Sequence, residues 1–135
     1  MGDCIFCKIV KGELPCYKIY EDEKVLAILD INPFALGHVL LLPKKHARWV
    51  WDLEDSDYLY LMEKVKTIAK VLQKSFNTDW IVEGIAGIDV SHSHVHVIPR
   101  QPNDGLGAFP GKFLDPKPTD EQFKGLVKKI KENIS

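Results

Sequence analysis

Short apolar runs divided by charged turns mark the first third of the chain. Residues 17–20 and 25–29 are typical of two strands, and the charged turn between them favours a hairpin. Residues 37–42 end in the apolar run Val39-Leu40-Leu41-Leu42, which Pro43 stops. Such a run predicts a strand buried on both faces.

Helical spacing of apolar residues is clearest over residues 55–76, which predicts one long helix. The stripe on its buried side consists of Tyr58, Leu61, Met62, Val65, Ile68, Ala69, Leu72 and Phe76. A short helix is predicted over residues 4–10, with Ile5, Phe6 and Ile9 on its buried side.

The remaining residues complete an α+β pattern. Residues 80–82 and 90–98 are expected to be strands, whereas residues 101–118, rich in Gly, Pro and Asp, indicate an irregular wrapping segment. Thr119 with Gln122 forms a capping box that begins a C-terminal helix. We expect a single domain with an antiparallel five-stranded sheet, one long central helix and a short helix near each terminus. Its core lies within about residues 1–100, and residues 101–135 wrap around it.

Composition narrows the possible partners and location. The 135 residues fit one domain, and a net charge of -1 from 18 basic and 19 acidic residues argues against binding to long nucleic acids. Three cysteines, an odd number, argue against a disulfide framework. No apolar stretch is long enough to span a membrane, and the first residues do not resemble a signal peptide. We therefore expect a cytoplasmic protein.

Three of the five histidines recur at every second position, as His92, His94 and His96. On a strand they would share one face, with neighbouring imidazoles roughly 6.5 to 7 Å apart, while Val95 and Val97 face the other way. A single histidine in a strand is usually structural. Three on one face, opposite apolar residues, indicate a functional site.

Such a row of imidazoles can do three kinds of chemistry. Imidazole titrates near neutral pH and acts as a general acid or base, it is a nucleophile, and it binds zinc. The spacing alone does not separate a nucleophile from a metal ligand. Cys4 and Cys7 also have metal-ligand spacing, but a single pair of this kind can equally be two reduced thiols.

Several separated motifs together resemble the histidine triad family, whose motif is His-φ-His-φ-His-φ-φ with φ apolar. The likeness runs from Cys4-Ile5-Phe6-Cys7 through Gly37-His38 and Pro43-Lys44-Lys45-His46 to the row that begins at His92. It covers about the first hundred residues, and the motifs occur in the family's order. The resemblance implies cleavage at the α-phosphate of nucleoside phosphoramidates, aminoacyl adenylates or dinucleoside polyphosphates, without a cofactor for the chemistry.

The resemblance also implies roles for individual residues. His94 would attack the α-phosphorus and form a nucleotidyl-histidine intermediate, which water then hydrolyses. His96 would hydrogen-bond a phosphate oxygen or the leaving group, and His38 would orient the triad. Asp30 would accept the ribose hydroxyls. The expected nucleotide contacts are Asp30, Ile31, Asn32, Phe6, Ile9, Ile28, Asp89, His94 and His96, of which Phe6, Ile9, Ile28 and Ile31 are candidates for the base slot.

The chain departs from the family pattern just before the triad. Ile88 replaces a Gln that contacts the phosphates in many members, and Asp89 brings a negative charge near them. Ser93 occupies an apolar position of the motif, and the family's Asn near Val82 is absent. We expect weaker use of polyphosphate substrates.

Zinc and self-association are further implications of the resemblance. In many bacterial-type members the cysteine pair is completed by two histidines, so the predicted structural zinc ligands are Cys4, Cys7, His46 and His92, with no role for Cys16. Family members usually dimerise through the long helix and an edge strand, which implies a homodimer. Two other functions stay open: a zinc hydrolase in which His92, His94 and His96 bind the metal, and a nucleotide-binding protein with little turnover.

Overall fold

The computed structural model describes residues 4–134, so the expectation about the first residues concerns positions that lie partly outside the described part of the chain. Five antiparallel strands form one sheet in the order β1-β2-β3-β5-β4. The strands are Lys18–Glu21, Val25–Leu29, Val39–Pro43, Ile81–Gly84 and Val95–Pro99, numbered β1 to β5 along the chain. The helices are α1 (Ile5–Val10), α2 (Asp55–Phe76) and α3 (Asp120–Lys131), with a 3-10 turn at Val50–Asp52.

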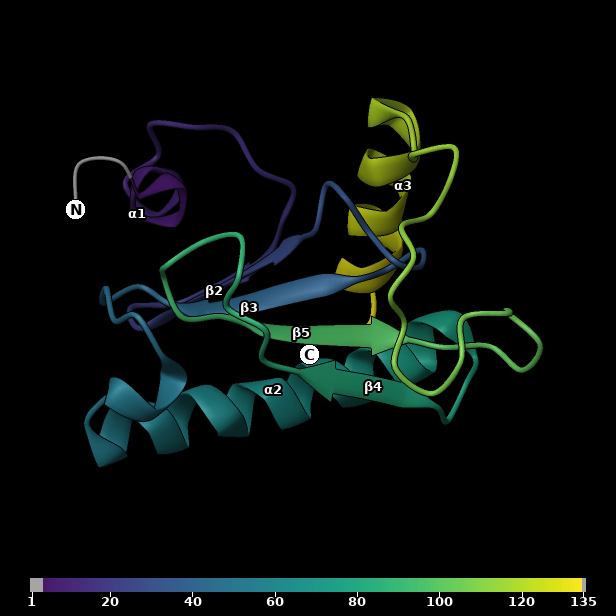
Figure 1. The fold of residues 1–135 in the computed structure, drawn as a ribbon. Helices are drawn as coiled ribbons and strands as arrows, with labels where there is room; N and C mark the ends of the chain where they lie inside the picture. The colour runs from purple at the N-terminus through teal and green to yellow at the C-terminus, as the bar shows by residue number, and fades with distance from the viewer. Residues whose placement is uncertain (1–3, 135) are drawn as a thin grey trace.

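The sheet lies between helices, with α1 on one face and α2 on the other (Figure 1). Alternation along β2 explains the layers: Val25, Ala27 and Leu29 pack in the core against α2, while Leu26 and Ile28 pack against Phe6 of α1. Burial on both faces is therefore the reason that β2 and β3 are continuously apolar, as the sequence predicts.

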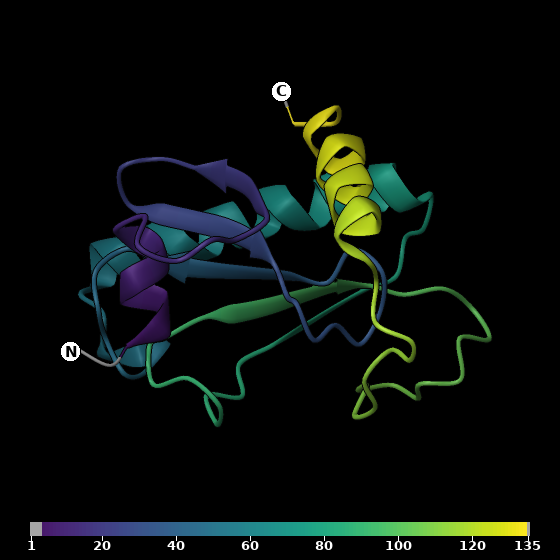
Figure 2. The same ribbon diagram turned by 90° about the horizontal axis from the view of Figure 1, so that it is seen from above.

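The C-terminal part of the chain closes the α2 side. Residues 101–118 form no helix or strand, as expected, and the Thr119–Gln122 capping box begins α3. Phe123 and Ile130 of α3 join the core on the α2 side, and Asn133 donates a hydrogen bond to Ser75 of α2 at 3.0 Å. Figure 2 shows α3 beside the C-terminal half of α2.

Arg100 orders the irregular segment from inside. Its guanidinium is fully buried, stacks on Trp80 at 4.2 Å and donates two hydrogen bonds to the Asp104 carboxylate at 2.6 and 2.8 Å. It also donates to the carbonyls of Gly107 and Ala108. A segment with no regular structure thus has its carbonyl groups satisfied by one cation.

The predicted long helix has the predicted bounds, but four other predictions need correction. The strand predicted over residues 90–98 begins only at Val95, because the Ser93 amide donates to the Ala47 carbonyl at 2.7 Å instead of joining the sheet. The strands near residues 37 and 80 begin and end one or two residues later than predicted. Ile5, expected on the buried side of α1, is 51% exposed because it lies on the flank of the helix away from Phe6.

Candidate active site and adjoining metal site

His94 lies just before β5, on the face of the sheet that α1 covers. Its ring is 6% exposed and meets the Phe6 ring edge-on, with centroids 5.0 Å apart. Nδ1 of His94 lies 2.7 Å from the carbonyl oxygen of His92. Because a carbonyl can only accept, Nδ1 carries the proton and Nε2 is left with a free lone pair. The geometry fixes the tautomer that a nucleophile needs.

Burial lowers the pKa of His94, so the neutral form is favoured near pH 7. The hydrogen bond to the His92 carbonyl and the negative charge of Asp89 act in the opposite direction, while the positive charge of Arg48 lowers the pKa. Asp89 and Arg48 therefore both lie close enough to affect His94.

His38 and His96 form a hydrogen-bonded pair beside His94. The amide of Phe34 donates to Nδ1 of His38 at 3.0 Å, which leaves the His38 proton on Nε2. Nε2 of His38 then donates to Nδ1 of His96 at 2.9 Å. In neutral His96 the remaining N–H is on Nε2, available to a ligand. A backbone amide thus sets the orientation of a hydrogen-bond donor two residues from His94.

Burial also keeps this pair neutral. Burial first, and the neighbouring histidines second, lower the pKa of His38 to about 3 and that of His96 to about 4. The rings of His94 and His96 lie with centroids 5.1 Å apart, closer than the spacing expected for an ideal strand. The two expected catalytic partners of His94 are therefore brought together around it.

Asp30 lies at the end of β2 against the same pair. One carboxylate oxygen is 3.5 Å from Nε2 of His38, and the other accepts the amide of Asn32 at 2.8 Å. Burial raises the pKa of Asp30. Asn32 is exposed, so the structure places Asp30 at the boundary between the buried histidines and solvent.

The four apolar residues expected at the base slot separate into two groups. Phe6 and Ile28 are buried together in the cluster under α1, with Ile9 packed against it. Ile31 is 56% exposed and lies outside that cluster. Ile28 is therefore covered, whereas Ile31 is accessible from solvent.

The segment before the triad is open to solvent. Ile88 is 85% exposed, and Asp89 is also exposed. Gly87 has a positive φ of 67°, and a Cβ there would lie 2.4 Å from the Trp49 ring. Only glycine fits at this turn.

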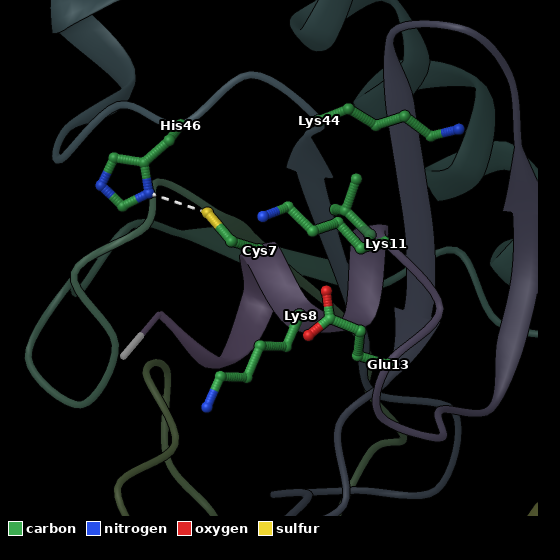
Figure 3. Close-up of a pocket in the computed structure, with 7 residues that line it drawn as sticks. Cys7, Lys8, Lys11, Glu13, Lys44 and His46 are labelled. Carbon is green, nitrogen blue, oxygen red and sulfur yellow. Dashed lines mark hydrogen bonds between the residues drawn. The ribbon is translucent and has the colours of Figure 1, made fainter. Parts of the chain in front are cut away.

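The predicted metal group gathers around His92. Nδ1 of His92 is 3.5 Å from the sulfur atoms of both Cys4 and Cys7, and Nδ1 of His46 is 3.2 Å from the Cys7 sulfur. All four ligand atoms lie within 4.8 Å of one another. Figure 3 shows Cys7 on α1 facing the His46 ring.

These separations fit a tetrahedral zinc ion. Zn–S and Zn–N bonds of about 2.3 and 2.0 Å place ligand atoms roughly 3.3 to 3.8 Å apart. Nε2 of His92 donates to the Pro43 carbonyl at 2.7 Å, so Nδ1 is unprotonated and directed at the thiols. His92 thus turns toward the cysteines and not into a cleft shared with the other two histidines. The irregular backbone before Val95 permits this.

Other features near the site were not predicted. A cavity of about 370 Å³ beside Cys7 and His46 is also lined by Lys8, Lys11 and Lys44, and its lining includes neither His94 nor His96 (Figure 3). Phe34 stacks on His38 on one side and on Phe113 on the other. A second group of potential ligand atoms consists of Asp30, His38 and His96. Arg48, whose charge lowers the pKa of His94, comes two residues after the Pro43-Lys44-Lys45-His46 motif. No sequence pattern indicates a role for Arg48 itself.

Known proteins match both the sequence and the fold. The HIT domain matches residues 11–103. An uncharacterised HIT-like protein of Borreliella burgdorferi is 43% identical over 99% of this chain and all of its own. The adenosine 5'-monophosphoramidase hnt1 of Schizosaccharomyces pombe is 38% identical over 97% of this chain and 98% of its own.

A solved structure supports the same comparison. The crystal structure of a zinc-bound histidine triad family protein from Mycobacterium smegmatis has a TM-score of 0.83. It is 29% identical, and the match covers 98% of this chain and 94% of the other.

Proposed function

The chain belongs to the histidine triad family, and from that premise we propose that it is a hydrolase that releases a nucleoside monophosphate from a nucleoside phosphoramidate. The observation that carries the proposal is the fixed tautomer of His94, whose Nδ1 is 2.7 Å from the His92 carbonyl. Its free Nε2 is the nucleophile. The adenosine 5'-monophosphoramidase named above supports this substrate class.

In the first step Nε2 of His94 bonds to the α-phosphorus, and the bond from phosphorus to the leaving nitrogen breaks. In the second step a water oxygen bonds to phosphorus and displaces His94. The leaving nitrogen takes one proton from solvent before the bond to phosphorus breaks, and it departs as a neutral amine. The attacking water leaves its oxygen and one hydrogen on the nucleotide and returns its other proton to solvent, so that overall one water is consumed. His96 donates its Nε2 hydrogen to the phosphoryl group, whose negative charge grows in the transition state.

Asp30 and the apolar residues around α1 bind the nucleoside. The Asp30 carboxylate accepts the ribose hydroxyls at the end of β2, while Asn32, whose amide Asp30 holds, lies at its rim. The base lies against Ile31 and the edge of the Phe6, Ile9 and Ile28 cluster. Asp89 beside the phosphates disfavours further negative charge, so the phosphoramidate is preferred over dinucleoside polyphosphates.

Cys4, Cys7, His46 and His92 would hold a structural zinc ion. The ion would fasten α1 to the segment after β3, and so keep Phe6 against His94. The zinc-bound relative from Mycobacterium smegmatis supports this assignment. No zinc takes part in the proposed reaction.

A homodimer accompanies this function. Its supports are the open edge of β4, the last strand in the sheet, and the exposed apolar residues Leu59 and Trp51 at 65% and 63% exposure. The sedimentation coefficient measures the assembly directly. A monomer at micromolar concentration would contradict the dimer.

The helices of the described residues include none that can cross a membrane, and the cytoplasmic location stays a prediction.

Two assays test the function. Adenosine phosphoramidate should yield AMP at a rate unchanged by removal of free metal with a chelator, and more efficiently than a dinucleoside polyphosphate does. Immediate loss of activity with chelator, while the fold persists, would favour a zinc hydrolase, for which Asp30, His38 and His96 offer ligand atoms. Tight AMP binding without turnover would favour a nucleotide-binding protein, the reading that Ile88 and Asp89 keep open.

A further inference from the structure

Arg48 places its own positive charge near His94. One buried nitrogen of its guanidinium finds no hydrogen-bond acceptor among the described residues. Among residues 4–134, Nη1 of Arg48 is buried and has no hydrogen-bond partner. Buried N–H groups without partners are rare, and each calls for a ligand or another explanation. The described residues also include no acidic side chain in an ion pair with Arg48.

Two contacts fix the position of this guanidinium. Its central carbon lies 4.0 Å from the centre of the Trp49 ring, and Trp49 stacks on Trp51 with centroids 4.8 Å apart. Nη1 also lies 3.1 Å from the point where a Cβ of Gly87 would be, a point that the Trp49 ring approaches as well. A planar group stacked on an aromatic ring beside a glycine turn loses little freedom when it binds a ligand.

The backbone carries Arg48 alongside the nucleophile. The Ala47 carbonyl accepts the Ser93 amide at 2.7 Å, and the rings of His46 and His92 lie with centroids 5.0 Å apart. Residues 46–48 therefore run next to residues 92–94.

The phosphoryl group needs a cation that the rest of the site does not supply. His38 and His96 are buried and neutral, and Asp89 is negative. Exposed Ile88 carries no donor on its side chain. An arginine offers several N–H groups in a plane that matches the oxygens of a phosphate.

We propose that Arg48 is a further phosphate-binding residue, whose guanidinium binds the nonbridging oxygens of the nucleotide α-phosphate and balances the charge of Asp89. The proposal rests on the proposed function, because it takes His94 as the site of phosphoryl transfer. The expected ligand is the monoanionic or dianionic phosphate of a nucleoside monophosphate.

The test compares AMP with adenosine, which lacks the phosphate, as ligands in calorimetry. Arg48→Gln should weaken AMP binding roughly 10- to 100-fold, the range for loss of a charge-assisted hydrogen bond, and leave adenosine binding unchanged. Arg48→Lys, which keeps the charge and loses the fork, should give an intermediate loss. Lys70→Gln, which removes the same charge from the exposed face of α2, is the matched control and should bind AMP like the native protein.

The outcomes separate this proposal from the proposed function. Equal AMP binding by native protein and Arg48→Gln, or a parallel loss of AMP and adenosine binding, overturns the role of Arg48. If native protein nevertheless releases AMP from the phosphoramidate, the proposed function stands. If native protein binds AMP selectively through Arg48 but releases none, only the hydrolase function falls. A native protein that neither binds AMP nor releases it from the phosphoramidate overturns both.

Discussion

Replacement of His38 by alanine tests whether a backbone amide controls the reaction through two histidines. Among the described residues, His38 makes no hydrogen bond with His94. It accepts from the Phe34 amide and donates to Nδ1 of His96 at 2.9 Å. In His38→Ala the His96 ring loses its hydrogen-bond partner. The His96 proton then lies on Nε2 in some molecules and on Nδ1 in others. His38 is therefore a positioning residue.

The magnitude follows from the bond that His96 makes in the transition state. A hydrogen bond to a charged group contributes about 1.5 to 3 kcal/mol, so His96→Ala should lower kcat roughly 10- to 150-fold. His38→Ala should lose most of this contribution. The double variant should be no slower than His96→Ala, because both single changes remove the same interaction.

Steady-state kinetics with adenosine phosphoramidate measure this cycle, and the melting temperature of each variant serves as the stability control. His38 is 1% exposed, so its removal also costs stability, and AMP affinity identifies molecules that remain folded. Multiplication of the two single effects in the double variant would refute the reasoning. An unchanged kcat in His38→Ala would refute it as well.

Three other predictions concern the metal, the wrapping segment and pH. Cys7→Ser should lower the zinc content measured by atomic absorption and lower the melting temperature; full zinc occupancy would argue against Cys7 as a ligand. Arg100→Leu should destabilise the protein by about 3 kcal/mol or more in urea unfolding, because the partly buried Asp104 carboxylate and two carbonyls lose their donor, and a change below about 1 kcal/mol would contradict this role. His38 and His96 have folded pKa values of about 3 and 4, below the ordinary 6.5, so the unfolded chain binds protons first as the pH falls. Stability should be fully present above pH 6.5 and fall toward pH 4 by roughly 1 kcal/mol per pH unit for each histidine, and a flat urea midpoint over this range would contradict the neutral pair.

The elements best predicted from the sequence are those whose burial pattern is local. The bounds of α2 follow from its apolar spacing, and the apolar runs of β2 and β3 follow from burial on both faces. The alternation of side chains between two faces was a weaker guide to the strand predicted over residues 90–98, in the part before Val95. There a long-range hydrogen bond from Ser93 to Ala47 replaces the sheet, and no local pattern indicates it.

The same distinction holds for the site. The cysteine and histidine motifs, together with the family resemblance, predicted which residues gather as the metal group. The hydrogen bonds that set each tautomer were not predictable in detail, since they depend on the Phe34 amide and the Pro43 carbonyl. Arg48 was missed because its significance lies in packing against Trp49 and Gly87, which only the fold brings together.

The central claim is that His94 forms a bond to phosphorus. The most direct measurement is the release of AMP from adenosine phosphoramidate by native protein and by His94→Ala, with AMP affinity as the control for folding. We predict that turnover falls by several orders of magnitude while AMP binding persists. In the native protein, the nucleotide should also be found bonded to His94 when the intermediate is trapped and its peptides are mapped at neutral or basic pH instead of in acid. Equal turnover by the two proteins would contradict the account.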